Sequence, residues 1–250
     1  MTQTGAPYLL FDAGGTLIFP DHILLAEQAQ TQGLDLDAAA LFAAHCNMIH
    51  SIDVTIRTRR RISRFWPDGY TAALLATTGH AGPAAAAVGK AGERYERQYG
   101  LWRRVYPYVE PTLAALADAG YRMSVISNAD GRAAALLTEV GLAHYFERIF
   151  DSTILGTAKP YPAIFHIALK ELGLPPAGAL YIGDMFFYDV WGANHVGMGA
   201  VHLDPQQLYA GWPGLHLPDI GHLPGWLAEY QANPGRHKLF PAGNIPLTLD

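Results

Sequence analysis

The amino-acid sequence predicts an α/β fold in which a doubly wound parallel sheet carries an inserted helical domain. Short apolar runs recur along the chain, helical patterns separate them, and one long early segment is helical throughout. Four apolar runs end in small or polar clusters: Tyr8–Phe11, Met123–Ile126, Leu180–Ile182 and Ala200–Leu203. Continuous apolar runs of this length are typical of strands that are covered on both faces, as in a parallel sheet. Ile149-Phe150 is a candidate fifth strand.

Helical patterns alternate with these runs. They extend over Pro111–Ala119, Gly131–Val140 and Ala163–Leu172, and Gly120, Gly141 and Gly173 stop them. Glycine commonly ends a helix because it accepts the left-handed conformation without a Cβ clash. Alternating strands and helices indicate a doubly wound sheet, in which ligands bind beyond the carboxyl ends of the strands. Polar residues follow those ends and are therefore expected along one edge: Asp12, Ser127, Asp151 and Asp184.

The segment from Asp21 to Arg104 has alanine-rich helical stretches and no clear strand. The helical stretches are Ala38–Ala44, Thr71–Thr77 and Ala84–Gln98. We therefore expect residues 1–20 and 105–232 to form a core domain, and residues 21–104 to form an inserted helical domain. Residues 233–250 contain several prolines and are expected to form an extended C-terminal tail.

Composition excludes several classes of protein. The 250 residues are 50% hydrophobic and 16% charged with a net charge of −5, which gives no electrostatic case for nucleic-acid binding. No segment approaches the roughly 18 consecutive apolar residues of a membrane helix, and the N-terminus lacks a basic stretch followed by an apolar one. The single cysteine, Cys46, excludes an internal disulfide. We expect a cytoplasmic protein without a membrane segment, as a monomer or a homodimer.

Four ordered motifs occur at the expected strand ends. They are Phe11-Asp12-Ala13-Gly14-Gly15-Thr16-Leu17, Ile126-Ser127-Asn128, Gly156-Thr157-Ala158-Lys159-Pro160, and Gly183-Asp184 with Asp189 five residues later. This order resembles the motifs of the haloacid dehalogenase-like (HAD) superfamily, over Tyr8 to about Leu203. Each motif alone is common, whereas all four in order are specific. The resemblance implies a Rossmann-like core and identifies the helical insert as the cap of the subclass whose cap lies between the first two motifs.

The resemblance also implies roles for the motif residues. Asp12 would be a nucleophile, Lys159 would neutralise Asp12 and an incoming phosphate, and Ser127 would donate to a phosphoryl oxygen. Backbone amides around Gly15, Thr16 and Asn128 would bind the substrate as well. An anionic nucleophile that attacks an anionic phosphoryl group needs such positive charge and oriented donors.

A magnesium site follows from the same resemblance. Asp12, Asp184 and the backbone carbonyl of Gly14 would hold Mg²⁺, which prefers oxygen ligands. Asp189 would orient Lys159 or a metal-bound water. Considered alone, each acidic residue has a simpler structural alternative, such as a helix cap at Asp12, a turn at Asp184, or a carboxylate that balances a helix dipole at Asp189.

Gly14 departs from the motif. Phosphatases of this superfamily carry a second aspartate at this position, which protonates the leaving group and later activates water. A positioned acid or base contributes about 10²–10⁴-fold to the rate, or roughly 3–5 kcal/mol of the barrier. Gly14 can supply the metal-binding carbonyl, but it cannot move a proton.

Three functions therefore stay open. The first is a hydrolase that acts on a small phosphorylated metabolite through an aspartyl-phosphate intermediate. The second is a 2-haloacid dehalogenase, whose halide leaving group needs no proton. The third is a weakly active or non-catalytic binding or regulatory protein with the same fold. The Gly183-Asp184 pair favours the first, because the dehalogenase branch does not keep this metal carboxylate.

A basic cluster is the most distinctive feature of the helical insert. It consists of Arg57, Arg59, Arg60, Arg61 and Arg64. It is either a solvated helix face or a binding surface in which Arg57 and Arg60 offer fork-shaped donors to an anionic substrate. His22 and His50 are candidate proton donors from the same region.

Overall fold

The computed structural model describes residues 6–62, 69–233, 239, 242 and 245–249, and it divides into two compact units. The core unit comprises Met1–Ile18 and Val105–Pro246, and the helical unit comprises Phe19–Arg104 and Leu247–Asp250. The first boundary therefore lies two residues before the predicted one. The predicted tail is divided between the two units, and its residues 234–238, 240–241, 243–244 and 250 lie outside the described part.

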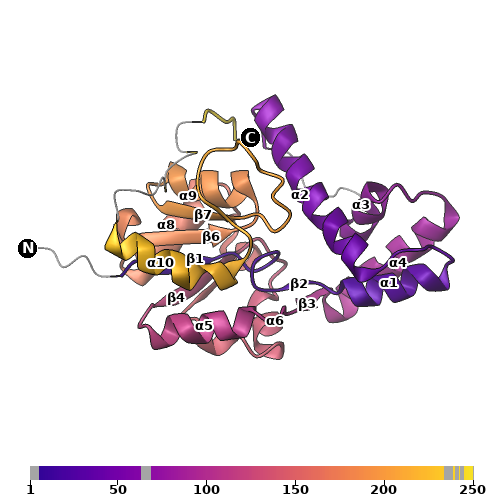
Figure 1. Ribbon diagram of the computed structural model, residues 1–250, viewed down its shortest axis with the longest axis horizontal. Helices are drawn as coiled ribbons and strands as arrows, with labels where there is room; N and C mark the ends of the chain where they lie inside the picture. Colours follow the sequence, from indigo (N-terminus) through magenta and orange to yellow (C-terminus); the bar gives the residue numbers. More distant parts are fainter. Residues whose placement is uncertain (1–5, 63–68, 234–238, 240–241, 243–244, 250) are drawn as a thin grey trace, which may run out of the picture. The chain divides into compact units, whose positions relative to one another are not determined.

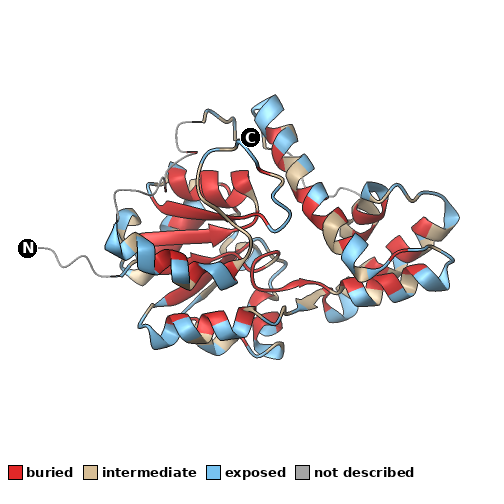
Figure 2. Ribbon diagram, viewed as in Figure 1, coloured by how far each residue is buried: buried red, intermediate tan, exposed pale blue. Residues whose placement is uncertain are grey.

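The core unit is built on a six-stranded sheet with the order β5-β4-β1-β6-β7-β8, in which every neighbouring pair is parallel. The strands are β1 (Tyr8–Phe11), β4 (Met123–Ser127), β5 (Ile149–Asp151), β6 (Ala179–Gly183), β7 (Gly199–Leu203) and β8 (His216–Leu217). All residues of β1, β4, β6 and β7 are buried, as Figure 2 shows. The predicted doubly wound parallel sheet is confirmed, and β8 is an additional strand.

Helices cover both faces of this sheet (Figure 1). Helices α5 (Val109–Asp118) and α6 (Ala133–Glu139) lie on one face, and α8 (Pro162–Leu172) and α9 (Gly192–His195) lie on the other. A short α7 (Ser152–Leu155) follows β5, and α10 (Leu223–Ala232) packs against α5. The glycines expected to stop α5, α6 and α8 all have positive φ, which confirms their role.

The helical unit contains α1 (His22–Thr31), α2 (Ala38–Arg59), α3 (Tyr70–Thr77) and α4 (Pro83–Tyr99). Its core is aliphatic, with Leu25, Leu41, Leu74 and Val88 among the buried residues. The expectation of a segment without strands was wrong, because β3 (Trp102–Arg104) pairs antiparallel with β2 (Phe19–Pro20). Strands this short contain too few residues to give a recognisable alternation. Among the described helices, none has the length and apolar character needed to cross a bilayer.

Candidate active site

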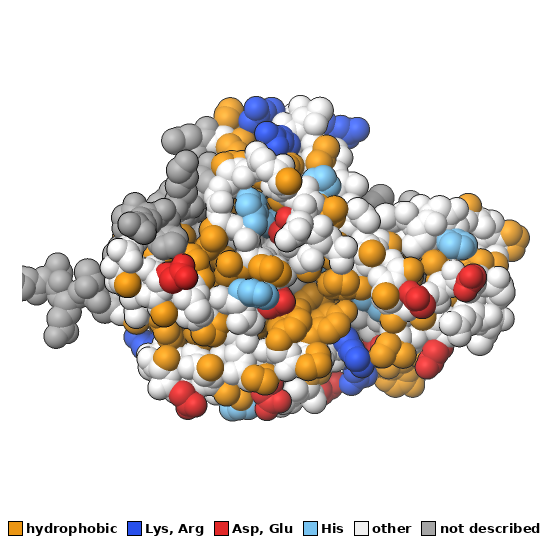
Figure 3. Space-filling view, in the orientation of Figure 1, with side chains coloured by type: hydrophobic (Ala, Val, Ile, Leu, Met, Phe, Trp, Pro, Cys, Tyr) orange, Lys and Arg blue, Asp and Glu red, His pale blue; other side chains and the backbone are white. Residues whose placement is uncertain are grey.

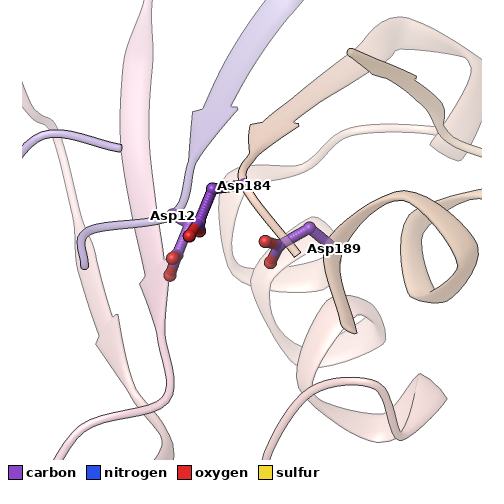
Figure 4. A group of neighbouring side chains, drawn as sticks. All are labelled: Asp12, Asp184 and Asp189. Atoms are coloured by element: carbon purple, nitrogen blue, oxygen red, sulfur yellow. The ribbon is translucent and has the colours of Figure 1, made fainter. Parts of the chain in front are cut away.

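Three buried aspartates meet at the carboxyl ends of the central strands (Figure 4). Asp12 follows β1 and Asp184 follows β6, and these strands pair so that Phe11 lies opposite Ile182. Asp189 lies in the π-helical turn Phe186–Trp191. One carboxylate oxygen from each aspartate lies within 4.8 Å of the others. The structure therefore brings together residues that lie far apart in the sequence.

Lys159 lies buried between two of these carboxylates. Its Nζ donates to Asp12 Oδ1 at 2.5 Å and to Asp189 Oδ1 at 2.7 Å. Asn128 fixes the lysine backbone, because its side-chain Nδ2 donates to the Lys159 carbonyl at 2.9 Å and its Oδ1 accepts from the Lys159 amide at 2.8 Å. This use of the Asn128 side chain was not predicted from the sequence. These two hydrogen bonds connect the second sequence motif, which contains Asn128, to the third, which contains Lys159.

The electrostatics of the site are dominated by burial. Burial raises the pKa of Asp12 to about 6, although Lys159 opposes the shift. Burial also raises the pKa of Asp184 well above its ordinary value, and the charges of Asp12 and Asp189 add to the shift. Burial lowers the pKa of Lys159, but these neighbouring carboxylates outweigh it and raise the pKa above its ordinary value. Lys159 therefore stays positively charged, but its single charge does not compensate the negative charge of the three carboxylates.

The donor set fits a divalent cation. With all three carboxylates ionised, the aspartates and the ammonium carry a net charge of −2, which a divalent ion would neutralise. Asp184 Oδ1 is buried without a hydrogen-bond partner in the described part of the chain. Such an orphaned charged oxygen is costly unless another group binds it. Carboxylate oxygens are the ligands that Mg²⁺ prefers, so the residues present suit this ion.

The loop after β1 leaves room for the Asp184 carboxylate. Gly15 has a φ of 80°, and a Cβ on it would lie 2.2 Å from Asp184 Oδ2. The tight turn is held by hydrogen bonds from the amides of Thr16 and Leu17 to the carbonyl of Ala13. Gly14 lies in the same turn, outside the left-handed region. The loop thus keeps its backbone against the carboxylate cluster, where the sequence predicted backbone contributions from Gly14, Gly15 and Thr16.

The other predicted core residues lie at the same edge. Ser127 ends β4, is buried, and pairs in register with Asp151 at the end of β5. The Asp151 carboxylate accepts hydrogen bonds from the amides of Gly131, Ala133 and Thr153. Asp151 therefore anchors the loop that follows Ser127 and serves the architecture of the site.

The arginines belong to the helical unit. Arg57 lies in the last turn of α2, and Arg60 caps this helix in a left-handed conformation with a φ of 57°. Arg57, Arg59, Arg60 and Arg61 are exposed. Figure 3 shows Lys and Arg side chains gathered around this end of α2. Arg64 lies outside the described residues.

Two residues near the cluster were missed by the sequence analysis. Tyr181 Oη accepts from Lys159 Nζ at 2.9 Å and donates to the carbonyl of Ile126 at 2.8 Å. His202 Nε2 lies 2.9 Å from the backbone oxygen of Asp184 and donates to it, because a carbonyl can only accept. Both lie within buried apolar strands, where pattern alone favours a packing role.

Comparisons with known proteins identify the family of the chain. A family model described as haloacid dehalogenase-like hydrolase matches residues 8–197. The chain is 36% identical over 99 residues to a glyceraldehyde 3-phosphate phosphatase of Methanopyrus kandleri, an alignment that covers 39% of this chain and 42% of that protein. It is 30% identical over 233 residues to haloacid dehalogenase-like hydrolase domain-containing protein 3 of Homo sapiens, which covers 86% of this chain and 91% of the relative.

A solved structure extends the comparison to the fold. A 2-haloacid dehalogenase from Pseudomonas syringae pv. Tomato is 25% identical with a TM-score of 0.52, and the match covers 90% of this chain and 99% of that one. The phosphatase alignment, by contrast, spans less than half the length of that relative. The family model and the nearly full-length human relative both cover most of the chain. The chain therefore belongs to the haloacid dehalogenase-like hydrolase family.

Proposed function

We propose that this protein is a Mg²⁺-dependent phosphatase that hydrolyses a small phosphorylated metabolite through an aspartyl-phosphate at Asp12. The observation that carries the proposal is the buried cluster of Asp12, Asp184 and Asp189, in which Asp184 Oδ1 has no hydrogen-bond partner in the described residues. A dehalogenation that needs no metal gives no reason to bury this carboxylate. The similarity to a glyceraldehyde 3-phosphate phosphatase supports the same assignment.

The side chains suit a two-step transfer. A carboxylate oxygen of Asp12 attacks phosphorus, an O–P bond to the enzyme forms, and the leaving oxygen departs with its electron pair. Water then attacks the acyl phosphate and releases inorganic phosphate and the Asp12 carboxylate. Ser127 donates to a phosphoryl oxygen, and Lys159 supplies fixed positive charge beside the attacking carboxylate. Mg²⁺, held by Asp12, Asp184 and the Gly14 carbonyl, would offset the negative charge that the phosphoryl group brings.

Gly14 limits the range of substrates in this proposal. No carboxyl group stands at position 14 to protonate the leaving oxygen. Phosphates with good leaving groups, such as acyl and aryl phosphates, need little help from an acid. We therefore expect higher turnover for these than for alkyl phosphates.

Arg57 and Arg60 are the proposed contacts to the anionic part of the substrate. Both are exposed at the C-terminal end of α2 in the helical unit. Guanidinium groups bind phosphate and carboxylate with two parallel hydrogen bonds, which favours anionic metabolites.

The function can be tested by a substrate screen. Purified protein would be assayed with Mg²⁺ and with EDTA against aryl, acyl and sugar phosphates and against 2-haloacids. We expect phosphate release that requires Mg²⁺ and falls at least about 10³-fold in Asp12→Asn, because the nucleophile is lost. Asp118→Asn, an exposed aspartate at the end of α5, is the control and should retain full activity. Halide release without metal would establish the dehalogenase instead, and no turnover of either class would favour a binding protein.

Metal binding gives a second test that does not depend on turnover. Asp184→Asn removes one charge from the cluster and an oxygen that lacks a partner among the described residues. We expect calorimetry to show Mg²⁺ binding to the wild type and at least tenfold weaker binding to Asp184→Asn, since hard cations require anionic oxygen ligands. Equal affinity in both proteins would remove Asp184 from the metal site.

A further inference from the structure

We propose that Tyr181 is a positioning residue, whose hydroxyl holds the third N–H of Lys159 and thereby fixes the ammonium between Asp12 and Asp189. The inference rests on the proposed function for its catalytic consequence. Its structural basis is the hydrogen bonding of the described residues at the centre of the core sheet.

The Lys159 ammonium has three N–H donors and no acceptor. Its three partners are Asp12 Oδ1 at 2.5 Å, Asp189 Oδ1 at 2.7 Å and Tyr181 Oη at 2.9 Å. The donors and the acceptors are therefore equal in number, and the side chain is only 3% exposed. Lys159 cannot donate to a phosphoryl oxygen unless one of these bonds breaks.

Tyr181 is itself held rigidly. Its ring is fully buried and packs edge-on against Phe165, with ring centroids 5.5 Å apart. Its hydroxyl donates to the carbonyl of Ile126, so a lone pair faces Lys159. Burial raises the pKa of Tyr181 well above its ordinary value, and the phenol therefore keeps the proton that this donation requires. Ile126 directly precedes Ser127, so one hydroxyl links the lysine to the strand that carries the serine.

This arrangement assigns Lys159 an electrostatic role. The ammonium stays at one place beside Asp12, while donation to the phosphoryl oxygens falls to Ser127 and the backbone amides near Gly15. Fixed charges stabilise a transition state better than mobile ones, because they need no reorganisation during the reaction. Tyr181 contributes by setting the position of the charge without contact with the substrate.

Removal of the hydroxyl should therefore affect the rate more than substrate binding. Tyr181→Phe leaves one N–H of the buried Lys159 side chain without its acceptor, so the ammonium shifts toward other acceptors. We expect kcat for an aryl phosphate to fall about ten- to a hundredfold, while KM changes less than twofold. A role in packing alone would leave kcat of the folded protein unchanged.

Tyr8→Phe is a matched control. Tyr8 is also buried in the core sheet, and its hydroxyl lies 2.6 Å from Ser124 Oγ and 3.3 Å from the carbonyl of Met123. Both variants lose a buried tyrosine hydroxyl on neighbouring strands, but only Tyr181 contacts Lys159. We expect similar shifts in thermal unfolding for both and a reduced kcat for Tyr181→Phe alone. Equal kcat values in the two variants would overturn the proposal.

A spectroscopic measurement separates this inference from the proposed function. The chain has only four lysines, and Lys159→Arg identifies the Lys159 ammonium signal in a ¹H–¹⁵N spectrum of the full-length protein. We expect this signal to exchange with water far more slowly than those of the exposed Lys90 and Lys170, and to exchange faster in Tyr181→Phe. If no phosphate is turned over, the proposed function fails, while the exchange rates still decide the inference. Rapid exchange at Lys159 in the wild type would overturn it, even if Tyr181→Phe does not fold.

Discussion

Gly15 shows how one residue determines the geometry of the site. Two constraints act on it: its φ is 80°, and a Cβ at this position would lie 2.2 Å from Asp184 Oδ2. Gly141 has nearly the same φ, 81°, but no atom lies within 4 Å of the place that its Cβ would take in the described structure. A comparison of substitutions at Gly15 and Gly141 therefore separates the cost of backbone strain from the cost of displacing the Asp184 carboxylate.

Alanine substitutions at these glycines give the first prediction. Gly15→Ala and Gly141→Ala should each lower the free energy of unfolding by about 1–2 kcal/mol, the cost of a left-handed conformation in a residue with a Cβ. Only Gly15→Ala should also weaken Mg²⁺ binding and phosphatase activity, by at least tenfold, because Asp184 must move. Urea unfolding and calorimetry measure the two quantities. Full Mg²⁺ affinity in Gly15→Ala would show that the carboxylate can relocate without loss.

Gly14 gives a prediction about the missing acid. Its φ lies outside the left-handed region, so an aspartate is compatible with the backbone conformation there. Gly14→Asp should raise kcat for alkyl phosphates about tenfold or more and for aryl phosphates much less, since only the poorer leaving group needs a proton. Steady-state kinetics with a matched pair of substrates measures this. An equal change for both substrates would contradict the proposed role of position 14.

At the scale of elements, the sequence identified the strands whose ends carry the site. Strands such as Tyr8–Phe11 are covered on both faces of the sheet, and strands of this kind are recognisable in the sequence as continuous apolar runs. The roles of Asn128 and Tyr181 cannot be recognised in this way, because both depend on Lys159, which lies 31 and 22 residues away in the sequence. Tyrosine in an apolar run has the same pattern whether its hydroxyl is structural or functional. The sequence pattern therefore predicted which strand ends lie together, and it did not resolve the hydrogen bonds between their residues.

Helices α1, α2 and α3 share a buried polar contact centred on Tyr70. Tyr70 Oη lies 3.1 Å from His22 Nε2 and 3.2 Å from His45 Nδ1, and both histidines are almost fully buried. Burial lowers the pKa of His22 to about 4, although Asp21 opposes the shift. Burial, with a contribution from His22, lowers the pKa of His45 to about 3. Both rings are neutral in the folded helical unit at pH 5 and above.

This contact predicts acid destabilisation of the helical unit. Below the unfolded pKa of about 6.5, the unfolded chain binds protons that the folded unit excludes, so stability falls as the pH decreases from about 6.5 toward 4. At pH 5, each histidine should lower the free energy of unfolding by about 2 kcal/mol relative to pH 7.5. Hydrogen exchange in α1 and α2, measured at both pH values and corrected for the intrinsic rates, reports this change.

Two variants test the origin of that effect. His45→Gln keeps a polar side chain but cannot be protonated, so its stability should depend less on pH than that of the wild type. His166→Gln, an exposed histidine on α8, should leave the pH dependence unchanged. If wild type and His45→Gln lose the same protection between pH 7.5 and pH 5, the buried histidines are not responsible.

At the scale of the whole molecule, the two units divide the work in the proposed function. The aspartates and Lys159 all belong to the core unit, whereas the exposed arginines at the end of α2 belong to the helical unit. The chain passes from one unit to the other between Ile18 and Phe19, between Arg104 and Val105, and again between Pro246 and Leu247. A change in the helical unit can therefore alter substrate affinity without altering the groups that perform the transfer.

The double variant Arg57→Ala/Arg60→Ala tests this division. If these guanidinium groups bind the anionic part of the substrate, KM should rise about tenfold or more while kcat changes little, because the interaction is the same in the ground state and the transition state. Arg94→Ala/Arg97→Ala, on the exposed side of α4 in the same unit, removes equal charge and should leave KM unchanged. Raised salt should increase KM for the wild type more than for the Arg57/Arg60 variant, since screening weakens a charge contact that the variant lacks. An unchanged KM in the Arg57/Arg60 variant would assign these arginines to a solvated helix end, and recognition of the anion would then rest with the core unit's Ser127, Lys159 and loop amides.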